Sequence, residues 1–495
     1  MEIPFVLLQV IIVPIITSIV CAFLGKKIGK NVGWIATAAL AYTTLLLVFI
    51  ATQLWSNSAA IHENYAWSTA AFGLNFSLSA DGLSLPVALI MNLVVMACAA
   101  FGVDYMKHRI EKIYGSEKKN MYGIYYSIFL LFSVGLLGVA LSTNLIAMFL
   151  FVEIVLIPAF VLIDLFGYDD KHRFALMYFM WNQIGAAVFL FGIVLAYIGT
   201  GSFEISALST ISGASIGFWV CLLIVIGWLM KMATFGFHLW VPHAHGNSPT
   251  SIAAIVATIV GLGTYVMARL LYGQLLASFQ VFGLPLMVLA VVTMVYAAYL
   301  TMAQDDIKRL YACSTIGQTA YSLLGIASLT ALGVSGGVFY FLSHILGKAI
   351  LFPVAGILVT QLGVRDIKQM GGLAKMMPWT ATICIVGSMI LAAFPPLTGF
   401  QAEWVMFTGI FKAGVDIASL PYLIIAIVAI FATFLTSVYT FWPAIRMFFG
   451  PAPSNMEPVK EAPKTMLIPL FMLGAVSLIV GMFPDLIMNF LTTVI

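Results

Sequence analysis

The chain has 495 residues, of which 22 are lysine or arginine and 19 are aspartate or glutamate, so charged residues make up 8% of it. Soluble domains carry about 25% charged and about 45–50% apolar residues, whereas 62% of this chain is hydrophobic. So few charges cannot build a water-facing surface, and a net charge of +3 without a basic tract excludes a nucleic-acid partner. The composition predicts an all-α membrane protein, because helices satisfy their backbone groups without water.

Apolar runs long enough to cross a bilayer, about 20 residues each, follow one another along the chain. The first has no basic segment before it and no clear small-residue cleavage site after it, so we expect a membrane span rather than a removed signal. The polar, aromatic segment 55–80 is predicted to be an external loop, and residues 1–495 a single polytopic membrane domain. Fourteen transmembrane helices are predicted, at 4–24, 32–54, 82–103, 122–141, 143–166, 174–199, 215–241, 250–272, 280–302, 309–328, 332–360, 377–413, 418–448 and 465–492.

Lysine and arginine test this number of spans, because they accumulate in cytoplasmic loops. Even-numbered loops receive only Lys412, and Arg269 lies near the external end of its span. The count therefore predicts a multi-pass protein of the cytoplasmic (inner) membrane with both termini on the outer side. Eighteen of the 22 basic residues fall on the side of the odd-numbered loops: Lys26, Lys27, Lys30, Lys107, Arg109, Lys112, Lys118, Lys119, Lys171, Arg173, Lys308, Arg309, Arg365, Lys368, Lys375, Arg446, Lys460 and Lys464.

The five cysteines stand singly inside apolar runs, and the sequence has no C-x-x-C motif. Iron–sulfur clusters and structural zinc ions are held by grouped cysteines. We therefore expect no metal site and no cofactor on this chain, and we interpret the thiols as buried helix residues.

Four charged side chains remain at membrane depth once the loops are set aside. Glu153 lies in the fifth span, Lys231 in the seventh, Lys348 in the eleventh and Glu403 in the twelfth. Each costs roughly 2.5–3.5 kcal/mol at a helix centre. Structural ion pairs between helices are one explanation. The other is a relay of titratable groups through a hydrated interior, which intramembrane ionisable residues usually mark.

A lysine suits such a relay because its proton affinity responds both to burial and to an approaching carboxylate. Histidines would supply intermediate stations. His344 precedes Lys348 by four residues, on the same helix face, and His238 follows Lys231 by seven. A single histidine in an apolar helix is more often a satisfied core residue, but the neighbouring charges favour the relay for these two.

Two of the spans, 215–241 and 377–413, are overlong, and each contains a Gly-Phe pair with a charge near it. Non-helical backbone at membrane depth is tolerated only where it is buried in protein or lines water. Matched interruptions also indicate inverted repeats with a pathway between them. We therefore predict that helices 7 and 12 are broken, within two inverted five-helix repeats at about 122–272 and 280–448. Packing alone is the alternative reason for the breaks.

Short motifs, each weak alone, occur along the spans in an order that resembles one known family. The chain is similar to the antiporter-like membrane subunits of respiratory complex I and its relatives, most closely the M-type subunit (chain 4). The resemblance implies fourteen helices, two inverted five-helix repeats and a polar axis along the membrane plane. The motifs are A-D-G-L-S at 80–84, F-V-E-I-V-L-I-P at 151–158, K-M-A-T-F-G-F-H-L-W-V-P-H-A-H-G-N-S-P-T at 231–250, D-D-I-K-R-L-Y-A-C-S-T-I-G at 305–317, S-H-I-L-G-K at 343–348, L-T-G-F-Q-A-E-W at 397–404 and G-M-F-P at 481–484.

The resemblance also implies roles for individual residues. Glu153 matches the glutamate of helix five that modulates the neighbouring lysine, and Lys231 matches the pumping lysine of broken helix seven. Glu403 matches the acidic terminal residue of helix twelve, where L- and N-type relatives usually carry lysine. Lys348 and His344 match a station on helix eleven that several relatives have.

Two positions depart from the M-type pattern. The central lysine usual on helix eight is absent and Gly261 occupies its place, so that Lys348 would replace it, as in the D-type subunit of multi-subunit sodium/proton antiporters. The proline common after the helix-seven lysine is replaced by Ala233. The first departure keeps deazaflavin-linked dehydrogenases, membrane-bound hydrogenases and the antiporter open as settings for the chain.

The sequence thus predicts a proton-translocating, non-redox subunit in the membrane arm of a complex I-like pump, an NADH:quinone oxidoreductase-type translocase. Its partners would be other antiporter-like and membrane-arm subunits, a peripheral redox arm and the lipid bilayer, with flavin, iron–sulfur clusters and quinone on those partners. In the predicted cycle Lys231 takes up a proton from the inner side, His344 and Lys348 pass it on, and Glu403 controls its release. Two alternatives stay open: a subunit of a sodium/proton antiporter or membrane-bound hydrogenase, and an inert membrane scaffold.

Overall fold

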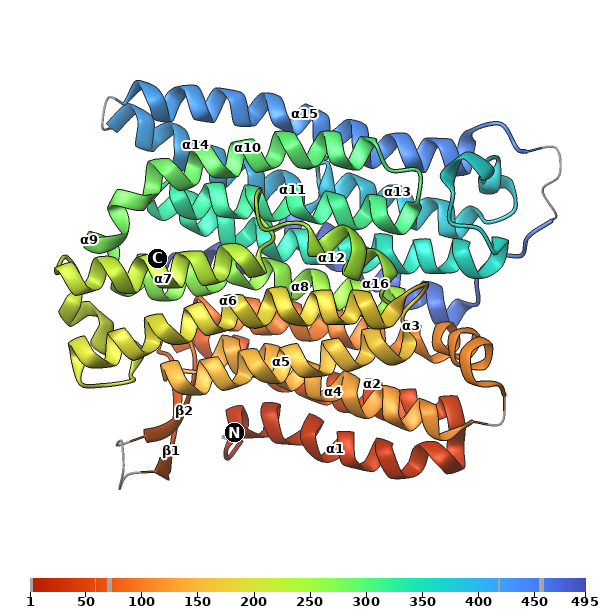
Figure 1. Cartoon of the computed structure of the whole chain (residues 1–495), viewed down its shortest axis with the longest axis horizontal. Helices are drawn as coiled ribbons and strands as arrows, with labels where there is room; N and C mark the ends of the chain where they lie inside the picture. The colour runs from red at the N-terminus through yellow and green to blue at the C-terminus, as the bar shows by residue number, and fades with distance from the viewer. Residues whose placement is uncertain (1–2, 58, 69–73, 117, 417–418, 454–457) are drawn as a thin grey trace.

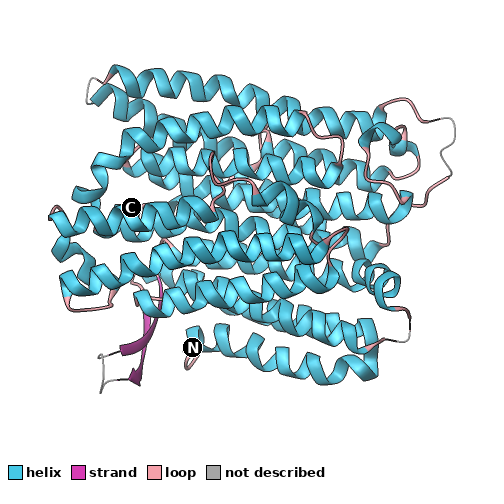
Figure 2. Ribbon diagram, in the orientation of Figure 1, coloured by secondary structure: helices cyan, strands magenta, loops and turns pink. Residues whose placement is uncertain are grey.

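The computed structural model is a bundle of long, roughly aligned helices with one small β-hairpin at one end (Figures 1 and 2). It describes the chain except residues 1–2, 58, 69–73, 117, 417–418 and 454–457. Within the described residues, ten helical segments are long and apolar enough to cross a membrane, and α7 and α13 are shorter apolar helices. The predicted all-α membrane class is therefore confirmed, with the hairpin as an addition that the sequence did not suggest.

The first half of the chain contains α1 to α8 and both strands. Their bounds are α1 Val6–Ile28, η1 Gly29–Asn31, α2 Val32–Asn57, β1 Ile61–Ser68, β2 Leu74–Ala80, α3 Ser84–Tyr114, α4 Asn120–Leu141, α5 Leu145–Phe166, α6 Lys171–Thr200, η2 Ile205–Ile211, α7 Ser215–Lys231, η3 Val241–His245, α8 Thr250–Val266 and η4 Met267–Tyr272.

The second half contains the remaining helices. Their bounds are α9 Leu276–Phe279, η5 Gln280–Phe282, α10 Gly283–Met302, α11 Ile307–Ala327, α12 Ala331–Leu362, η6 Ile367–Gln369, η7 Leu373–Lys375, α13 Pro378–Leu391, α14 Thr398–Asp416, α15 Leu420–Phe449, α16 Lys464–Met482 and α17 Asp485–Leu491.

Helix α3 and the last predicted span differ from their predicted bounds. The hydropathy of α3 falls after residue 103 because charged residues begin there, but the helix continues to Tyr114. Lys30 Nζ pairs with Asp104 Oδ1 at 2.6 Å, and Arg109 donates to the carbonyls of Phe166 and Gly167, so contacts with neighbouring segments hold these extra turns. The span 465–492 comprises two helices, α16 and α17, because Pro484 interrupts it.

The segment predicted as an external loop folds, where it is described, into an antiparallel hairpin of β1 and β2, with Tyr65 opposite Phe76. The hairpin is tied to the first helix. Both carboxylate oxygens of Glu63 accept hydrogen bonds from the first turn of α1, from Leu7 N and Leu8 N, each at 2.9 Å. A carboxylate at a helix N-terminus satisfies free amides and complements the helix dipole.

The two ends of the bundle have different chemistry. At one end, which we call the basic face, Arg365 bonds to Asp169 at 2.9 Å and to the carbonyl of Gly246 at 3.0 Å, so three loops meet at one guanidinium. At the opposite end, the hairpin end, Arg269 pairs with Asp81 at 2.6 Å. Both termini lie toward the hairpin end (Figure 1).

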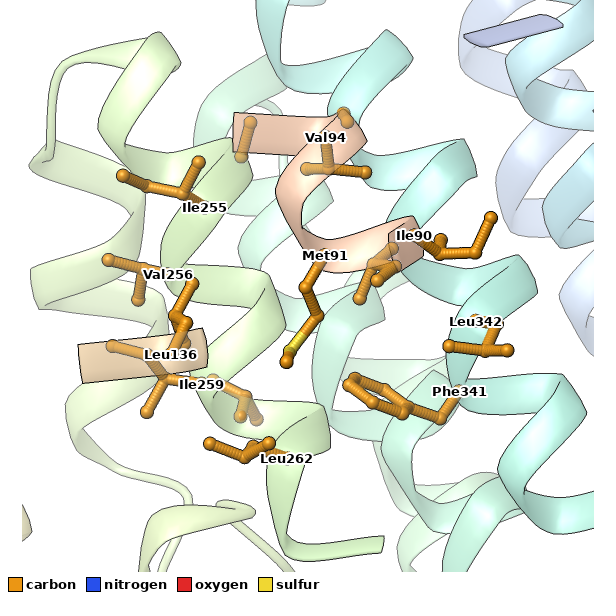
Figure 3. Close-up of a cluster of buried hydrophobic side chains, with 14 of the residues drawn as sticks. Ile90, Met91, Val94, Leu136, Ile255, Val256, Ile259, Leu262, Phe341 and Leu342 are labelled. Atoms are coloured by element: carbon orange, nitrogen blue, oxygen red, sulfur yellow. The ribbon is translucent and has the colours of Figure 1, made fainter. Parts of the chain in front are cut away.

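The interior is built around α8 and α12, whose most apolar stretches are 100% and 94% buried. Figure 3 shows part of this core, where Met91 of α3, Leu136 of α4, Ile259 of α8 and Phe341 of α12 pack together. The outer helices α6 and α15 keep much of their apolar surface exposed, as lipid-facing or partner-facing helices do. Helices α8, α11 and α12 therefore place their side chains away from lipid, and these helices carry much of the polar interior.

Candidate functional site

The seventh span is interrupted directly after Lys231, where α7 ends. Gly236 has a φ of +93°, a left-handed conformation that favours glycine. Ala233 has a φ of +53°. Proline is locked near −65°, so the proline usual in this motif cannot occupy position 233 in this backbone, and the departure seen in the sequence has a conformational reason.

Lys231 is only 2% exposed. Its ammonium donates to the carbonyl of Asn182 on α6 at 3.1 Å. Together with Tyr178 and Trp228 it lines a small cavity between α5, α6, α7 and α8, with room for about one water molecule. Tyr178 Oη and Trp228 Nε1 have no hydrogen-bond partner among the described residues. Buried polar atoms are otherwise paired with protein or ordered water, so this cavity is suited to hold water beside the lysine.

Glu153 lies on α5, on the same side of the molecule as this cavity. Its helix neighbours Val152, Val155 and Leu156 line the cavity that Lys231 also lines. No ion pair joins the two residues within the described part of the chain, and Glu153 Oε1 has no hydrogen-bond partner there.

Lys348 lies in the middle of α12 and has no exposed surface. Its ammonium donates to the carbonyl of Tyr311 at 2.7 Å and to Ser314 Oγ at 2.5 Å, both on α11. It also lies 5.8 Å from the centre of the Phe352 ring. As with Lys231, no acidic group of the described residues forms an ion pair with it.

Two histidines are near Lys348. His344, predicted from its spacing, is buried one turn earlier on α12, and the charge of Lys348 acts on it. His245, which the sequence reasoning missed, is fully buried in η3 and stacks on Phe352 with ring centroids 4.6 Å apart. All four ring nitrogens lack hydrogen-bond partners within the described residues. His245 was missed because its place follows from the path of the chain after the break, which spacing along one helix does not describe.

His238 is placed differently. Its Nε2 lies 3.0 Å from Tyr296 Oη on α10, and its ring stacks on Phe235 at 6.0 Å. It therefore faces α10, and no hydrogen bond joins it to Lys231 or Lys348 in the described structure.

Helix α11 contacts both lysine sites, through side chains about 140° apart around its axis. Thr319 donates to the carbonyl of Met232, at the break after Lys231, at 3.2 Å. On the same helix Ser314 contacts Lys348, as described above. Gln318, four residues after Ser314, donates to Tyr439 Oη at 3.1 Å and accepts from Tyr340 Oη at 2.9 Å. Ser314, Gln318 and Tyr321 follow the i, i+4, i+7 spacing of one helix face, a signal that was present in the sequence.

Glu403 lies beyond these tyrosines, on α14. Glu403 Oε1 has no hydrogen-bond partner in the described residues. With Trp404, Glu403 lines a cavity of about 570 Å³ that opens to the surface between α14 and α15. The axis thus reaches the side of the molecule at this carboxylate.

The break before Glu403 is fixed by close backbone packing. α13 ends at Leu391 and α14 begins at Thr398. A Cβ on Gly399 would lie 2.0 Å from the carbonyl oxygen of Ile390, so only glycine fits. The hydroxyl of Thr398 lies 2.9 Å from Ser343 Oγ of α12 and 2.7 Å from Ser477 Oγ of α16, which anchors the start of α14.

Gly261 of α8 stands where a central lysine was expected. A Cβ at this position would lie 2.3 Å from Cδ2 of Phe341, so the phenyl ring of α12 fills that space. Figure 3 shows Phe341 packed beside α8. No three His, Cys, Asp or Glu side chains gather as metal ligands anywhere in the residues that the structure describes.

A polytopic helical bundle with two broken spans and a line of buried charges defines an antiporter-like membrane subunit. The family described as "NADH:quinone oxidoreductase/Mrp antiporter, TM" matches residues 142–440, and the chain belongs to this family. The resemblance inferred from the motifs is thereby confirmed, and with it the predicted class of proton-translocating, antiporter-like subunits.

Similar proteins span nearly the whole chain. It is 29% identical to the NAD(P)H-quinone oxidoreductase chain 4-2 of Synechocystis sp., over 91% of this chain and 80% of that one. It is 27% identical to the F(420)H(2) dehydrogenase subunit M of Methanosarcina mazei, over 97% and 95%. Among solved structures, a chain of the Mrp complex from Dietzia sp. has the same fold, with a TM-score of 0.86, 21% identity and 99% and 97% coverage.

Proposed function

We propose that the chain moves protons across the membrane through a lateral relay of Glu153, Lys231, Lys348 and Glu403, within the membrane arm of a complex I-like redox-driven pump. The observation that carries the proposal is the burial of Lys231 and Lys348, 2% and 0% exposed, without an ion pair among the described residues. Structural ion pairs would need a partner for each lysine, so the relay is the better explanation.

In this mechanism Lys231 takes up a proton at the end of α7, where the cavity beside it can hold water. Glu153 stabilises the protonated lysine, and any change in the distance between the two alters how tightly the proton is held. The break after Lys231 supports such movement, because the lysine sits at a helix end rather than within a continuous helix.

Protons then pass along α11 to the second lysine. Thr319 contacts the break, and Ser314 contacts Lys348. His245 and His344 offer ring nitrogens beside Lys348 that can accept or donate a proton. The hydrogen-bonded set of Gln318, Tyr340 and Tyr439 leads on toward Glu403, which we propose controls release. His238 is proposed as an accessory station only, because it faces α10.

The finer features of the fold belong to the same proposal. We propose fourteen crossings, with inverted five-helix repeats at about 122–272 and 280–448 and both termini on the outer side of the cytoplasmic membrane. The two breaks support the repeats, since Lys231 precedes the first break and Glu403 follows the second. The concentration of basic side chains at the face opposite the hairpin supports the orientation.

The proposed partners are those suggested by the complexes to which the similar proteins belong. NAD(P)H-quinone oxidoreductase and F(420)H(2) dehydrogenase are named as redox complexes, so this chain is proposed to work beside other membrane-arm subunits and a peripheral redox arm. Flavin, iron–sulfur clusters and quinone are proposed to lie on those partners. Their chemistry would reach this subunit as an electrostatic or conformational change near Glu153.

A subunit of a multi-subunit sodium/proton antiporter is the second candidate. One observation favours it: the central lysine stands on α12, as the resemblance implies for the antiporter's D-type subunit, while Phe341 fills the space at Gly261. Copurification separates the two candidates. Redox subunits in the purified complex would support the pump, and their absence together with sodium-dependent proton exchange would support the antiporter.

The test of the relay is proton uptake by membrane vesicles that contain the assembled complex with Lys231→Ala. We expect uptake to fall to the background of vesicles without the complex, while Lys412→Ala, at an exposed site on α14, retains wild-type uptake. Normal pumping by Lys231→Ala in a fully assembled complex would mean that the chain is an inert scaffold.

A further inference from the structure

A long groove runs down the surface between α13 and α16, starting at the basic face. Its volume is about 1130 Å³. Apolar side chains line its length, and two lysines, Lys375 and Lys464, stand at its mouth. The groove lies away from the relay, and nothing in the proposed transport uses it.

The depth of the groove matches one leaflet of a bilayer. Along α16 the lining runs from Lys464 at the first turn to Ala475. That is a rise of about 16 Å at 1.5 Å per residue, and half of the bilayer's hydrocarbon core is about 15 Å. An acyl chain of the leaflet at the basic face would lie along Leu467 and Phe471 and reach Ala475 at its end.

Two lysines and one carboxylate, Glu461, stand at the mouth, so the formal charge there is positive by one. Lys375 and Lys464 are exposed, and neither forms an ion pair there. Glu461 lies between them but its oxygens are engaged elsewhere. It accepts from Trp379 N at 2.8 Å, from Thr380 Oγ1 at 2.5 Å and from its neighbour's amide at 2.9 Å, so it caps the start of α13.

An exposed tryptophan marks the level of the headgroups. Trp379 is 60% exposed although it lies in the first turn of an apolar helix, and its ring packs edge-on against Phe471 at 6.0 Å. Tryptophan is enriched at the boundary between headgroups and hydrocarbon. Below it Ile468, 64% exposed, continues the apolar wall into the membrane.

We propose that this groove binds one anionic phospholipid, with its phosphate between Lys375 and Lys464 and an acyl chain along Leu467, Phe471 and Ala475. The distribution of chemistry supports a lipid over a neighbouring helix. Cations stand at one end only and the rest is apolar, which is the polarity of an amphiphile, and basic pockets at this level are suited to anionic headgroups.

The test uses the intact complex in nanodiscs that contain brominated lipid, which quenches tryptophan fluorescence on contact. The signal of Trp379 is the difference between the wild type and Trp379→Phe. Brominated phosphatidylglycerol and brominated phosphatidylcholine are compared at equal, low mole fractions. We expect the anionic lipid to half-saturate quenching at a lower mole fraction, and added salt to reduce this preference because it screens the charges.

Each lysine contributes to the preference. Lys375→Gln and Lys464→Gln should each raise the half-saturating mole fraction of the anionic lipid about fivefold, the factor that corresponds to one basic side chain at a membrane surface. Lys412→Gln, at an exposed lysine of α14, should leave it unchanged. Ala475→Phe, which fills the deep end of the groove, should weaken both lipids equally.

Three results would overturn the proposal. They are equal quenching by both lipids, an anionic preference that survives the double lysine variant, and no quenching of Trp379 in the assembled complex, which would mean that a protein partner covers the groove. Thermal unfolding of each variant and the subunit content of its complex establish that the protein is folded. The effect of salt on the lipid preference is measured on the wild type, so it does not depend on whether a variant folds.

Discussion

Replacing Lys348 by methionine removes a buried charge and leaves an unbranched side chain that is one atom shorter. The ammonium has no exposed surface and donates two hydrogen bonds, to the Tyr311 carbonyl at 2.7 Å and to Ser314 Oγ at 2.5 Å. A lysine at a helix centre costs roughly 2.5–3.5 kcal/mol in the membrane, and a hydrogen bond from a charged donor contributes roughly 1.5–3 kcal/mol.

The substitution leaves both acceptors with partners. Ser314 Oγ itself donates to the Tyr311 carbonyl at 3.0 Å, and Thr315 Oγ1 donates to the same carbonyl at 3.1 Å. Ser314 Oγ loses the bond that it accepts but keeps the one that it donates, and the Tyr311 carbonyl keeps two donors. The loss therefore lies near the lower end, roughly 3 kcal/mol for two bonds, and about offsets the cost of the charge. We expect the unfolding free energy of Lys348→Met to stay within about 2 kcal/mol of the wild type, with proton uptake reduced to background.

Two assays on one preparation check this: proton uptake by vesicles with the assembled complex, and unfolding of the detergent-purified complex. Leu346→Met is the matched control, because it places the same side chain two residues earlier on α12, at a site that is also buried, without removing a charge. It should retain uptake and lose less than about 1.5 kcal/mol. Uptake near the wild-type rate in Lys348→Met would refute the relay at this position, and a much larger loss of stability would show that the lysine is structural.

Four further outcomes are expected. Glu153→Gln should slow proton uptake several-fold and change its pH profile, since it removes the charge that acts on the lysine of α7; unchanged uptake at every pH would count against that pairing. Tyr340→Phe should slow uptake without affecting assembly, because it breaks the bond to the α11 glutamine; full activity would place the tyrosines outside the route. Gly261→Ala should destabilise the protein by about 1–3 kcal/mol in unfolding assays, since the added methyl has no space. Burial raises the pKa of Asp81, but the hydrogen bonds and charge of Arg269 outweigh burial and lower that pKa to about 2 from 3.8. The ionised carboxylate therefore contributes about 2 kcal/mol to the unfolding free energy above about pH 4, and this contribution is lost as the pH falls toward 2. Unfolding across that range measures the loss, and Arg269→Gln should flatten it.

The sequence could predict the charged residues of the site because a charged residue in an apolar span is rare and easily recognised. Glu153, Lys231, Lys348 and Glu403 stand out against the apolar composition of their spans. The helix neighbours of Glu153 line the same cavity as Lys231. The interruptions were visible for a similar reason, since glycine and proline destabilise a continuous helix and their presence in an overlong span indicates a break.

The middle of the site was harder to predict because its groups are uncharged. Ser314, Gln318, Thr319 and Tyr321 are common residues in soluble helices, and only their burial in a helix surrounded by other helices makes them distinctive. Burial depends on which helices surround α11, and sequence periodicity does not specify neighbours. His245 was missed for the same reason, because the chain reaches Phe352 only by folding back after the break.

The absence of a lysine on α8 and its presence on α12 are connected through one aromatic side chain. Phe341 lies two turns before Lys348 on the same helix, and its ring occupies the space that a side chain at Gly261 would need. A lysine on α8 would therefore have to displace that ring, while Lys348 reaches its acceptors on α11 without disturbing it. Glycine at 261 is then a packing requirement of the Phe341 ring, and we expect substitutions at these two contacting positions to be coupled.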